Sequence, residues 1–169
     1  MLVLKSAITD PGSPDKTGDD RFGHNRAANC AWVIDAAAHA AHLHPFPGAG
    51  SGAAWLAGCL SSCLHDPPGT DEMVLAYFAR ILTLVRDEAV RQSQIPLQEL
   101  PMEARPAAPM MWMRRLGGIC EFAWSGDCFA IAGTQRGETL LIGAVEGAGE
   151  ETRTAARMLE MAPEERWSR

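Results

Sequence analysis

Three aspartates surround one apolar segment near the start of the chain and could hold a cation. Asp19 and Asp20 are adjacent in a turn, and Asp35 directly follows the apolar run at residues 30–34. We predict that this run is a buried strand, so a carboxylate at its end is partly desolvated, which is costly unless a cation or hydrogen-bond donors satisfy it. Hard divalent cations such as Mg²⁺ and Mn²⁺ prefer oxygen ligands. For Asp19 and Asp20, the alternative is a solvated pair in a turn.

Three histidines form a second candidate site. His39, His42 and His44 lie in one alanine-rich segment that we expect to be a loop, and imidazole ligates transition metals such as zinc and nickel. The alternative is a loop that merely carries histidines, because no cysteine or fixed scaffold lies close in sequence. If the chain were a metal carrier of this kind, binding would depend on the histidines rather than on Asp35.

Two further patterns suggest chemistry but have simpler explanations. Residues 48–53 match the glycine pattern of a dinucleotide-binding loop, but such a loop directly follows a strand, whereas Pro45 and Pro47 precede this one. We therefore expect a flexible start to a helix. The five cysteines form neither an even set nor a CxxC pair, which argues against a disulfide framework or a zinc site. We expect them to be small buried hydrophobic residues, with Cys59 and Cys63 on one helix face.

Periodicity and turn residues predict the elements that must position these side chains. Residues 2–9 and 30–34 are expected to be strands. Ser51 is expected to cap a helix at residues 52–64, and Thr70 a second helix beside it, whose apolar stripe ends at residues 91–94. After a linker at residues 95–109, the runs 110–115, 119–124, 128–132 and 139–142 predict an antiparallel meander. Residues 150–161 predict a final helix.

Composition restricts the class of protein. The chain has 169 residues, of which 47% are hydrophobic and 21% charged, which predicts one globular domain over residues 1–169. The formal net charge of -6 disfavours nucleic acid as a partner, because nucleic-acid-binding proteins usually present clustered Lys and Arg. The apolar residues 1–4 are interrupted by Lys5 and are too few for a signal peptide or a membrane span. We expect a cytoplasmic protein without a membrane partner.

Four short segments occur along the chain in this order: GDDRFG from Gly18, WVIDAA from Trp32, SGAAWL from Ser51 and SGDC from Ser125. They resemble motifs of the metal-dependent Ser/Thr protein phosphatases of the PPM (type 2C) class. The first resembles the Asn-Glu-Asp-Arg segment of that family, and the second its strand that ends in Asp-Gly. The third resembles the start of the first helix in bacterial members, and the fourth the Gly-Asp-Ser/Cys turn between two sheet strands.

The resemblance implies a fold and a reaction. The fold would be a four-layer α-β-β-α sandwich, an α/β (α+β) arrangement of antiparallel sheets flanked by helices. Two Mn²⁺ or Mg²⁺ ions would lie between the sheets, bridged by Asp35 and completed by the Ala36 carbonyl and by Asp19 or Asp20, while Asp127 could contact a further ion. Water activated by the metal would hydrolyse phosphoserine or phosphothreonine in a phosphorylated protein substrate.

The departures from the family pattern are equally specific. Lys16 lies near the usual position of a phosphate-binding Arg and would act as a point charge without the bidentate fork. Gly18, Asp19 and Ala36 replace the usual Asn, Glu and Gly. Asp127 is the last aspartate of the chain, so the two later metal-binding aspartates of the family have no counterpart. We therefore expect a truncated member that corresponds to the N-terminal portion of the domain, about two thirds of it on ordinary domain sizes.

These departures leave a second function open. A catalytically inactive, truncated phosphatase-like domain could act in binding or regulation instead. A sandwich that lacks its last strands would also expose sheet edges and apolar surface, which favours self-association.

Overall fold

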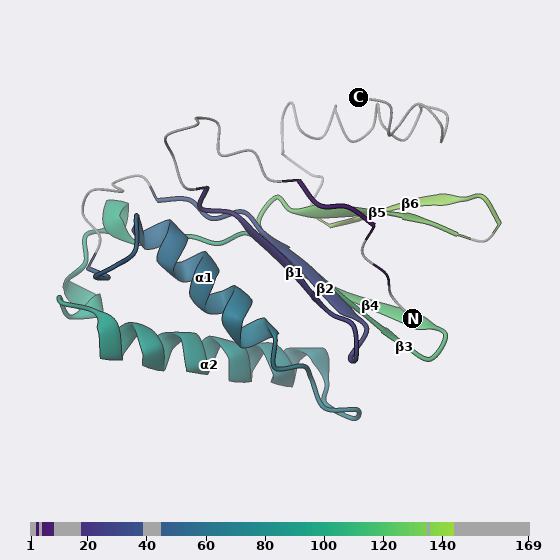
Figure 1. Cartoon of the computed structure of the whole chain (residues 1–169), viewed down its shortest axis with the longest axis horizontal. Coiled ribbons are helices and arrows are strands. Elements are labelled where there is room, and N and C mark those ends of the chain that lie inside the picture. The colour runs from purple at the N-terminus through teal and green to yellow at the C-terminus, as the bar shows by residue number, and fades with distance from the viewer. Residues whose placement is uncertain (1–2, 4, 9–17, 39–44, 135, 144–169) are drawn as a thin grey trace.

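Within the described residues of the computed structural model, the chain is a mixed α+β protein with a four-stranded antiparallel sheet, a two-stranded antiparallel sheet and two α-helices (Figure 1). The structure describes residues 3, 5–8, 18–38, 45–134 and 136–143. The expected α+β class is therefore present in this part of the chain. None of its helices is both long and apolar enough to cross a membrane.

The four-stranded sheet has the strand order β1-β2-β3-β4. Its strands are β1 (Arg21–Asn25), β2 (Cys30–Ile34), β3 (Met110–Leu116) and β4 (Ile119–Ser125). The second sheet pairs β5 (Phe129–Gly133) with β6 (Thr139–Gly143). The helices are α1 (Gly52–Leu64) and α2 (Val74–Gln92), followed by the short 3₁₀ helices η1 (Leu97–Glu99) and η2 (Met102–Ala104).

One face of the four-stranded sheet forms the main hydrophobic core. Alternate side chains of β2 point to opposite faces, and Cys30, Trp32 and Ile34 are buried on the face that α1 and α2 cover (Figure 1). Trp112 of β3 and Tyr77 of α2 are fully buried in the same cluster. The strand predicted at residues 30–34 is confirmed, and it is buried because the helix pair packs against it.

The beginning of α1 is confirmed, and that of α2 differs from the prediction. Ser51 is the N-cap of α1, and its Oγ accepts a hydrogen bond of 2.9 Å from the backbone N–H of Ala54. Helix α2 begins at Val74 without a side-chain cap, so the prediction that Thr70 caps it is wrong. The preceding turn is fixed instead by Glu72, whose carboxylate accepts from the Gly69 N–H at 3.0 Å.

A tryptophan and a glycine on neighbouring strands fit closely together. Gly23 of β1 is the register partner of Trp32 of β2. A Cβ atom added at Gly23 would lie 2.4 Å from Cζ2 of the Trp32 ring, so the indole occupies the space of a side chain at position 23. Trp32 is also held by α1, because its Nε1 donates to Ser61 Oγ at 3.1 Å. The indole thereby connects β1, β2 and the helix layer.

One arginine is buried in the helix-facing layer. Arg114 of β3 is 5% exposed, and its guanidinium donates to the carboxylate of Glu121 on β4. It also donates to the carbonyl oxygen of Glu72 at 2.9 Å. Arg114 therefore joins the sheet to the loop between the two helices, with its charge paired as a buried charge must be.

Two predicted features of the sheets are wrong. Of the strand expected at residues 2–9, the described residues 3 and 5–8 form no strand. Ser6 and Ile8 instead line a pocket on the second face of the sheet. The expected meander is divided, because β4 and β5 belong to different sheets. The chain turns between them at Gly126, whose φ is 68° and where an added Cβ would lie 2.7 Å from Cβ of Pro109. The helix expected at residues 150–161 lies outside the described residues.

Candidate metal centre

A pocket of about 600 Å³ lies on the sheet face opposite the helices. Strands β1, β2 and β3 form its floor, and residues 6–8 and 128–130 form its walls. Most of the lining side chains are apolar, including Val33 and Met111. The polar side chains of the pocket therefore stand out as candidates for chemistry.

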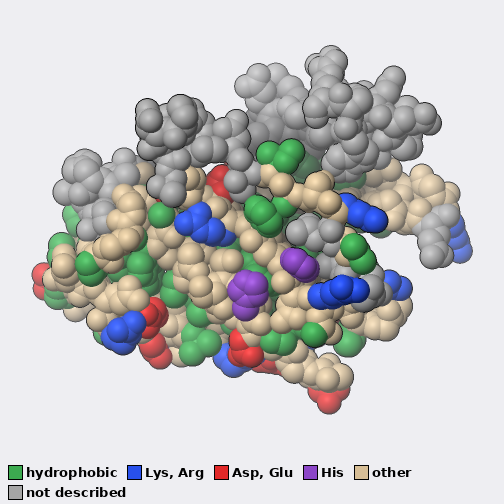
Figure 2. Space-filling model, viewed as in Figure 1, with side chains coloured by type: hydrophobic (Ala, Val, Ile, Leu, Met, Phe, Trp, Pro, Cys, Tyr) green, Lys and Arg blue, Asp and Glu red, His purple; other side chains and the backbone are tan. Residues whose placement is uncertain are grey.

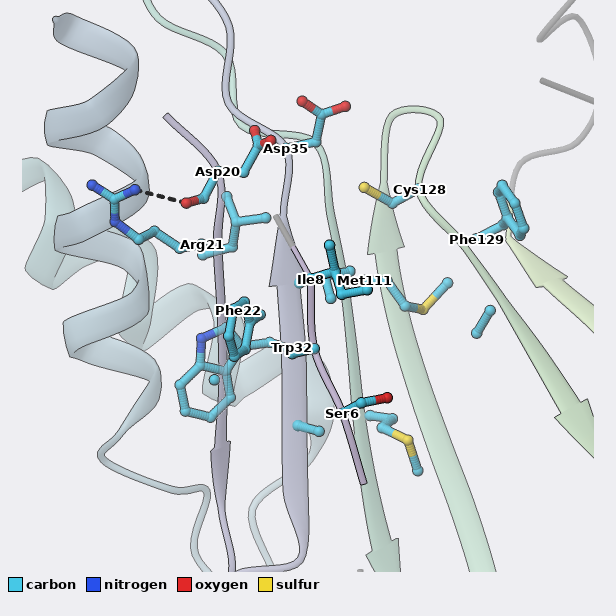
Figure 3. Close-up of a pocket in the computed structure, with 17 residues that line it drawn as sticks. Ser6, Ile8, Asp20, Arg21, Phe22, Trp32, Asp35, Met111, Cys128 and Phe129 are labelled. Carbon is cyan, nitrogen blue, oxygen red and sulfur yellow. Dashed lines mark hydrogen bonds between the residues drawn. The ribbon is translucent and has the colours of Figure 1, made fainter. Parts of the chain in front are cut away.

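Asp20 and Asp35 lie together at one end of this pocket (Figure 3). Their proximity follows from the strand register, because Arg21 at the start of β1 pairs with Ile34 at the end of β2. Asp20 and Asp35 flank this pair and share a face with Phe22 and Val33, since side chains alternate along a strand. The structure therefore brings together two of the predicted carboxylates, one at each end of the β1–β2 hairpin.

Asp19 is directed elsewhere. Its Oδ1 accepts a hydrogen bond of 2.9 Å from Ser51 Oγ, which in turn caps α1. Adjacent residues of an extended chain point to opposite sides, so Asp20 faces the pocket while Asp19 joins β1 to the helix layer. Of the two adjacent acids expected to complete the site, Asp20 is the one that lines the pocket.

Arg21 fixes the turn that carries both acids. Its Nη1 donates to the carbonyl oxygen of Gly18 at 2.7 Å and to that of Asp20 at 2.6 Å, and Figure 3 marks the second of these bonds. The Arg in the GDDR segment is therefore a positioning residue for the turn, and its bonds leave the carboxylate of Asp20 free of Arg21.

Cys128 lies close to the acidic end of the pocket, across from Asp35 in Figure 3. Burial raises the pKa of its thiol to about 11, and the negative charges of Asp35 and Asp127 contribute to the rise. The charge of Asp20 has a smaller effect of the same sign. Four groups from three separate segments thus lie close enough to interact electrostatically, and the thiol is the member that the carboxylate pattern of the sequence does not indicate. Its place in the SGDC segment was the available signal.

Asp35, Ala36 and Asp127 occupy different environments. Asp35 is exposed, so the expectation that its carboxylate is partly desolvated is wrong. The reason is that alternation along β2 places it on the incompletely covered face of the sheet. Ala36 is buried with its methyl group in the helix-side core. Asp127 is exposed in the turn between β4 and β5.

The other predicted ligands fall outside the part of the chain that the structure describes. Lys16 is one of them, and His39, His42 and His44 are the others. All five cysteines are free, as expected. Cys30 is buried, but Cys120 is exposed, so the prediction that every cysteine is buried is wrong for Cys120. Cys120 of β4 is the register partner of Arg115 of β3, near the solvent-exposed end of the β3–β4 hairpin.

The chemistry of the donors suits a hard cation with few protein ligands. Among the described residues, no three side chains of the His, Cys, Asp and Glu types form a ready-made metal-binding group. Mg²⁺ commonly binds through one or two carboxylates and keeps several waters. The pair Asp20 and Asp35 fits this mode, in which water and backbone oxygens supply the remaining ligands.

The rest of the visible surface carries mixed charge. Figure 2 shows acidic and basic side chains interspersed on the face viewed in Figure 1.

Comparisons of the chain with models of protein families, with curated proteins and with solved structures gave no match. The likeness to PPM phosphatases therefore rests on the four sequence motifs.

Proposed function

We propose that the chain is a PPM-type, metal-dependent phosphatase domain that acts on phosphoserine or phosphothreonine. The observation that supports this proposal is the placement of Asp20 and Asp35, which flank two paired strands and lie at one end of one pocket. Asp35 is exposed and Asp20 is half-buried, and a carboxylate pair at the end of a pocket can bind a divalent cation that is also open to a substrate phosphate.

Each residue has a defined part in this proposal. Asp20 and Asp35 would hold Mn²⁺ or Mg²⁺; Asp127, which could contact a further ion, directly precedes Cys128 of the pocket lining but does not itself line the pocket. The Ala36 carbonyl follows Asp35 directly in the chain. By the resemblance, Lys16 would hold the substrate phosphate. Bound metal would supply a water of lowered pKa for phosphate-ester hydrolysis.

The finer architecture belongs to the same proposal. The β5–β6 hairpin faces the second side of the four-stranded sheet (Figure 1), and residues 128–130 border the pocket there. In a four-layer sandwich, this hairpin would belong to the second sheet, and the metal centre would lie between the two sheets.

The first test is calorimetric titration of Mn²⁺ into the full chain and into Asp35→Asn. We expect the variant to bind at least about tenfold more weakly, because it removes one of the charged oxygen ligands that a hard cation prefers. Asp71→Asn is the matched control, since Asp71 is exposed outside the pocket and should leave binding unchanged. Equal affinity in the wild type and in Asp35→Asn would contradict the metal centre.

The second test measures hydrolysis of a phosphoserine peptide in Mn²⁺. We expect turnover in the wild type and its loss in Asp35→Asn, with Asp71→Asn as active as the wild type. Metal binding without turnover would refute the phosphatase and support the second candidate.

That second candidate is a catalytically inactive domain that binds or regulates a partner. The observation that favours it is the commitment of Asp19 to Ser51, which leaves two carboxylates lining the pocket. In this case the half-covered sheet face and the sheet edges would mediate self-association. Sedimentation of the full chain tests this, and a monomer at all concentrations would contradict it.

A further inference from the structure

A second concave surface lies in the helix layer, away from the candidate metal centre. It has a volume of about 550 Å³ and is bordered by α1, α2 and the segment that contains η1 and η2. We call it the helix-side groove. None of its lining residues also lines the pocket that contains Asp20 and Asp35. Its volume is in the range of sites that bind small molecules.

The floor of the helix-side groove is aromatic and aliphatic. Phe46 and Trp55 stack with ring centroids 3.8 Å apart and planes inclined by 8°. The indole N–H of Trp55 donates to Gln92 Oε1 at 2.9 Å, so its polar group is already satisfied. Val85 and Leu100 add buried aliphatic surface. Such a floor favours the apolar or aromatic body of a ligand.

The rim of the groove carries two exposed arginines. Arg105 donates through Nε to the carbonyl oxygen of Leu100 at 3.0 Å, which anchors its guanidinium beside the floor. Arg86 pairs with Asp87 at 2.9 Å, but both side chains are more than 60% exposed. An ion pair this exposed is weak, so Arg86 can turn to an incoming anion at small cost.

The two parts of the groove match one class of ligand. Guanidinium groups bind carboxylates with charge-assisted, often bidentate hydrogen bonds. We propose that the helix-side groove binds a small amphipathic carboxylic acid, with its apolar body on the Phe46–Trp55 floor and its carboxylate between Arg86 and Arg105. This site is independent of the proposed phosphatase activity, since it uses other residues on the other side of the sheet.

The test compares an acid with its uncharged analogue. In calorimetric titrations of the full chain, 4-phenylbutyrate should bind saturably, and 4-phenylbutyramide at least about tenfold more weakly, because it lacks the charge. The double substitution Arg86→Gln and Arg105→Gln should remove this preference for the acid. The control Arg91→Gln should preserve it, because Arg91 is an exposed arginine of α2 that pairs with Glu88 and does not line the groove.

A second variant places a negative charge on the rim. Leu82 lines the groove and is 59% exposed, so Leu82→Glu should leave the fold intact. It should weaken binding of 4-phenylbutyrate several-fold and leave binding of the amide nearly unchanged. Absence of saturable binding by 4-phenylbutyrate would overturn the proposal, and so would equal affinity for acid and amide. Retention of the preference for the acid in the double arginine variant would overturn it as well.

Discussion

The two faces of the four-stranded sheet differ in how completely they are covered. On the helix-facing side, Trp32 and Trp112 are 2% and 0% exposed. On the pocket side, Val33 and Trp124 are both 48% exposed, whereas Met111, their shared register partner in the same row across the sheet, is 5% exposed. The same strands therefore carry a close-packed face and a loosely covered one.

The helix-facing side of the sheet contributes most of the stability, and the pocket side carries the candidate ligands. Burial of large apolar side chains supplies most of the free energy of folding, and the largest of them lie on the helix-facing side. The carboxylates Asp20 and Asp35 lie on the loosely covered side, where a ligand can reach them. Substitutions on the first face should therefore lower the free energy of unfolding more, and substitutions of the carboxylates on the second face should change binding.

The largest expected effect comes from Trp112→Ala. It should lower the free energy of unfolding by about 3–5 kcal/mol, because it leaves a large cavity in the core. Trp124→Ala on the other face should cost about 1 kcal/mol, since half of its surface is already in water. Urea denaturation followed by circular dichroism measures both. Equal losses of unfolding free energy in the two variants would contradict the proposed difference between the two faces of the sheet.

The next largest effect is expected from the buried arginine of the helix-facing side. Arg114→Met should destabilise by about 2–4 kcal/mol, because it leaves the Glu121 carboxylate and the Glu72 carbonyl oxygen without this donor. Arg115→Met is the matched control, since Arg115 is the exposed neighbour on β3 and should change stability by less than about 0.5 kcal/mol. A stable Arg114→Met would show that this contact is dispensable.

A smaller loss of stability is expected at the hydrogen bond between Ser51 at the start of α1 and Asp19 in the turn that carries Asp20. Ser51→Ala removes the cap of α1 and the hydrogen bond to Asp19, and should cost about 1 kcal/mol of unfolding free energy. Ser62→Ala in the same helix is exposed and should be neutral or slightly stabilising, because Ala has the higher helix propensity. If Ser51→Ala also weakens Mn²⁺ binding, the position of the turn that holds Asp20 depends on the helix.

The last effect occurs only at alkaline pH, and thiols on both faces contribute to it. Burial raises the pKa of Cys59 on the helix side to about 12 and that of Cys128 at the pocket to about 11, from an ordinary value of 9.0. Above pH 9 the thiols ionise in the unfolded chain but stay protonated in the folded one, so stability should fall as the pH rises from 9 toward 11. Cys59→Ser and Cys128→Ser should each reduce this fall. Urea midpoints that decline identically in all three proteins would contradict the assignment.

The sequence was sufficient for elements whose signals are local. The strand at residues 30–34 and the helix from Gly52 to Leu64 were predicted with the bounds found, because β-forming residues and a capping serine define them within a few positions. Asp35 at the end of that strand follows from the same pattern. Strand β1 was not predicted; once its bounds are known, alternation assigns Asp20 to the same face as Phe22 and Asp19 to the other face.

The features that were missed depend on distant partners. Whether β5 continues the sheet of β4 depends on the turn at Gly126 and its packing against Pro109, which local periodicity does not encode. Residues 3 and 5–8 have the composition of a strand but lie where their backbone has no ladder partner. The place of Cys128 beside Asp35 also requires the tertiary fold, because the two residues are far apart in the sequence.

The contact between Gly23 and Trp32 has a consequence for how this sequence can vary over evolutionary time. Because the indole occupies the space of a side chain at position 23, the two positions cannot change independently. Homologous chains should keep glycine wherever the tryptophan is kept, and should admit larger residues at position 23 only together with a smaller residue at position 32. Such paired changes, found in a family alignment, would mark the members that share this fold.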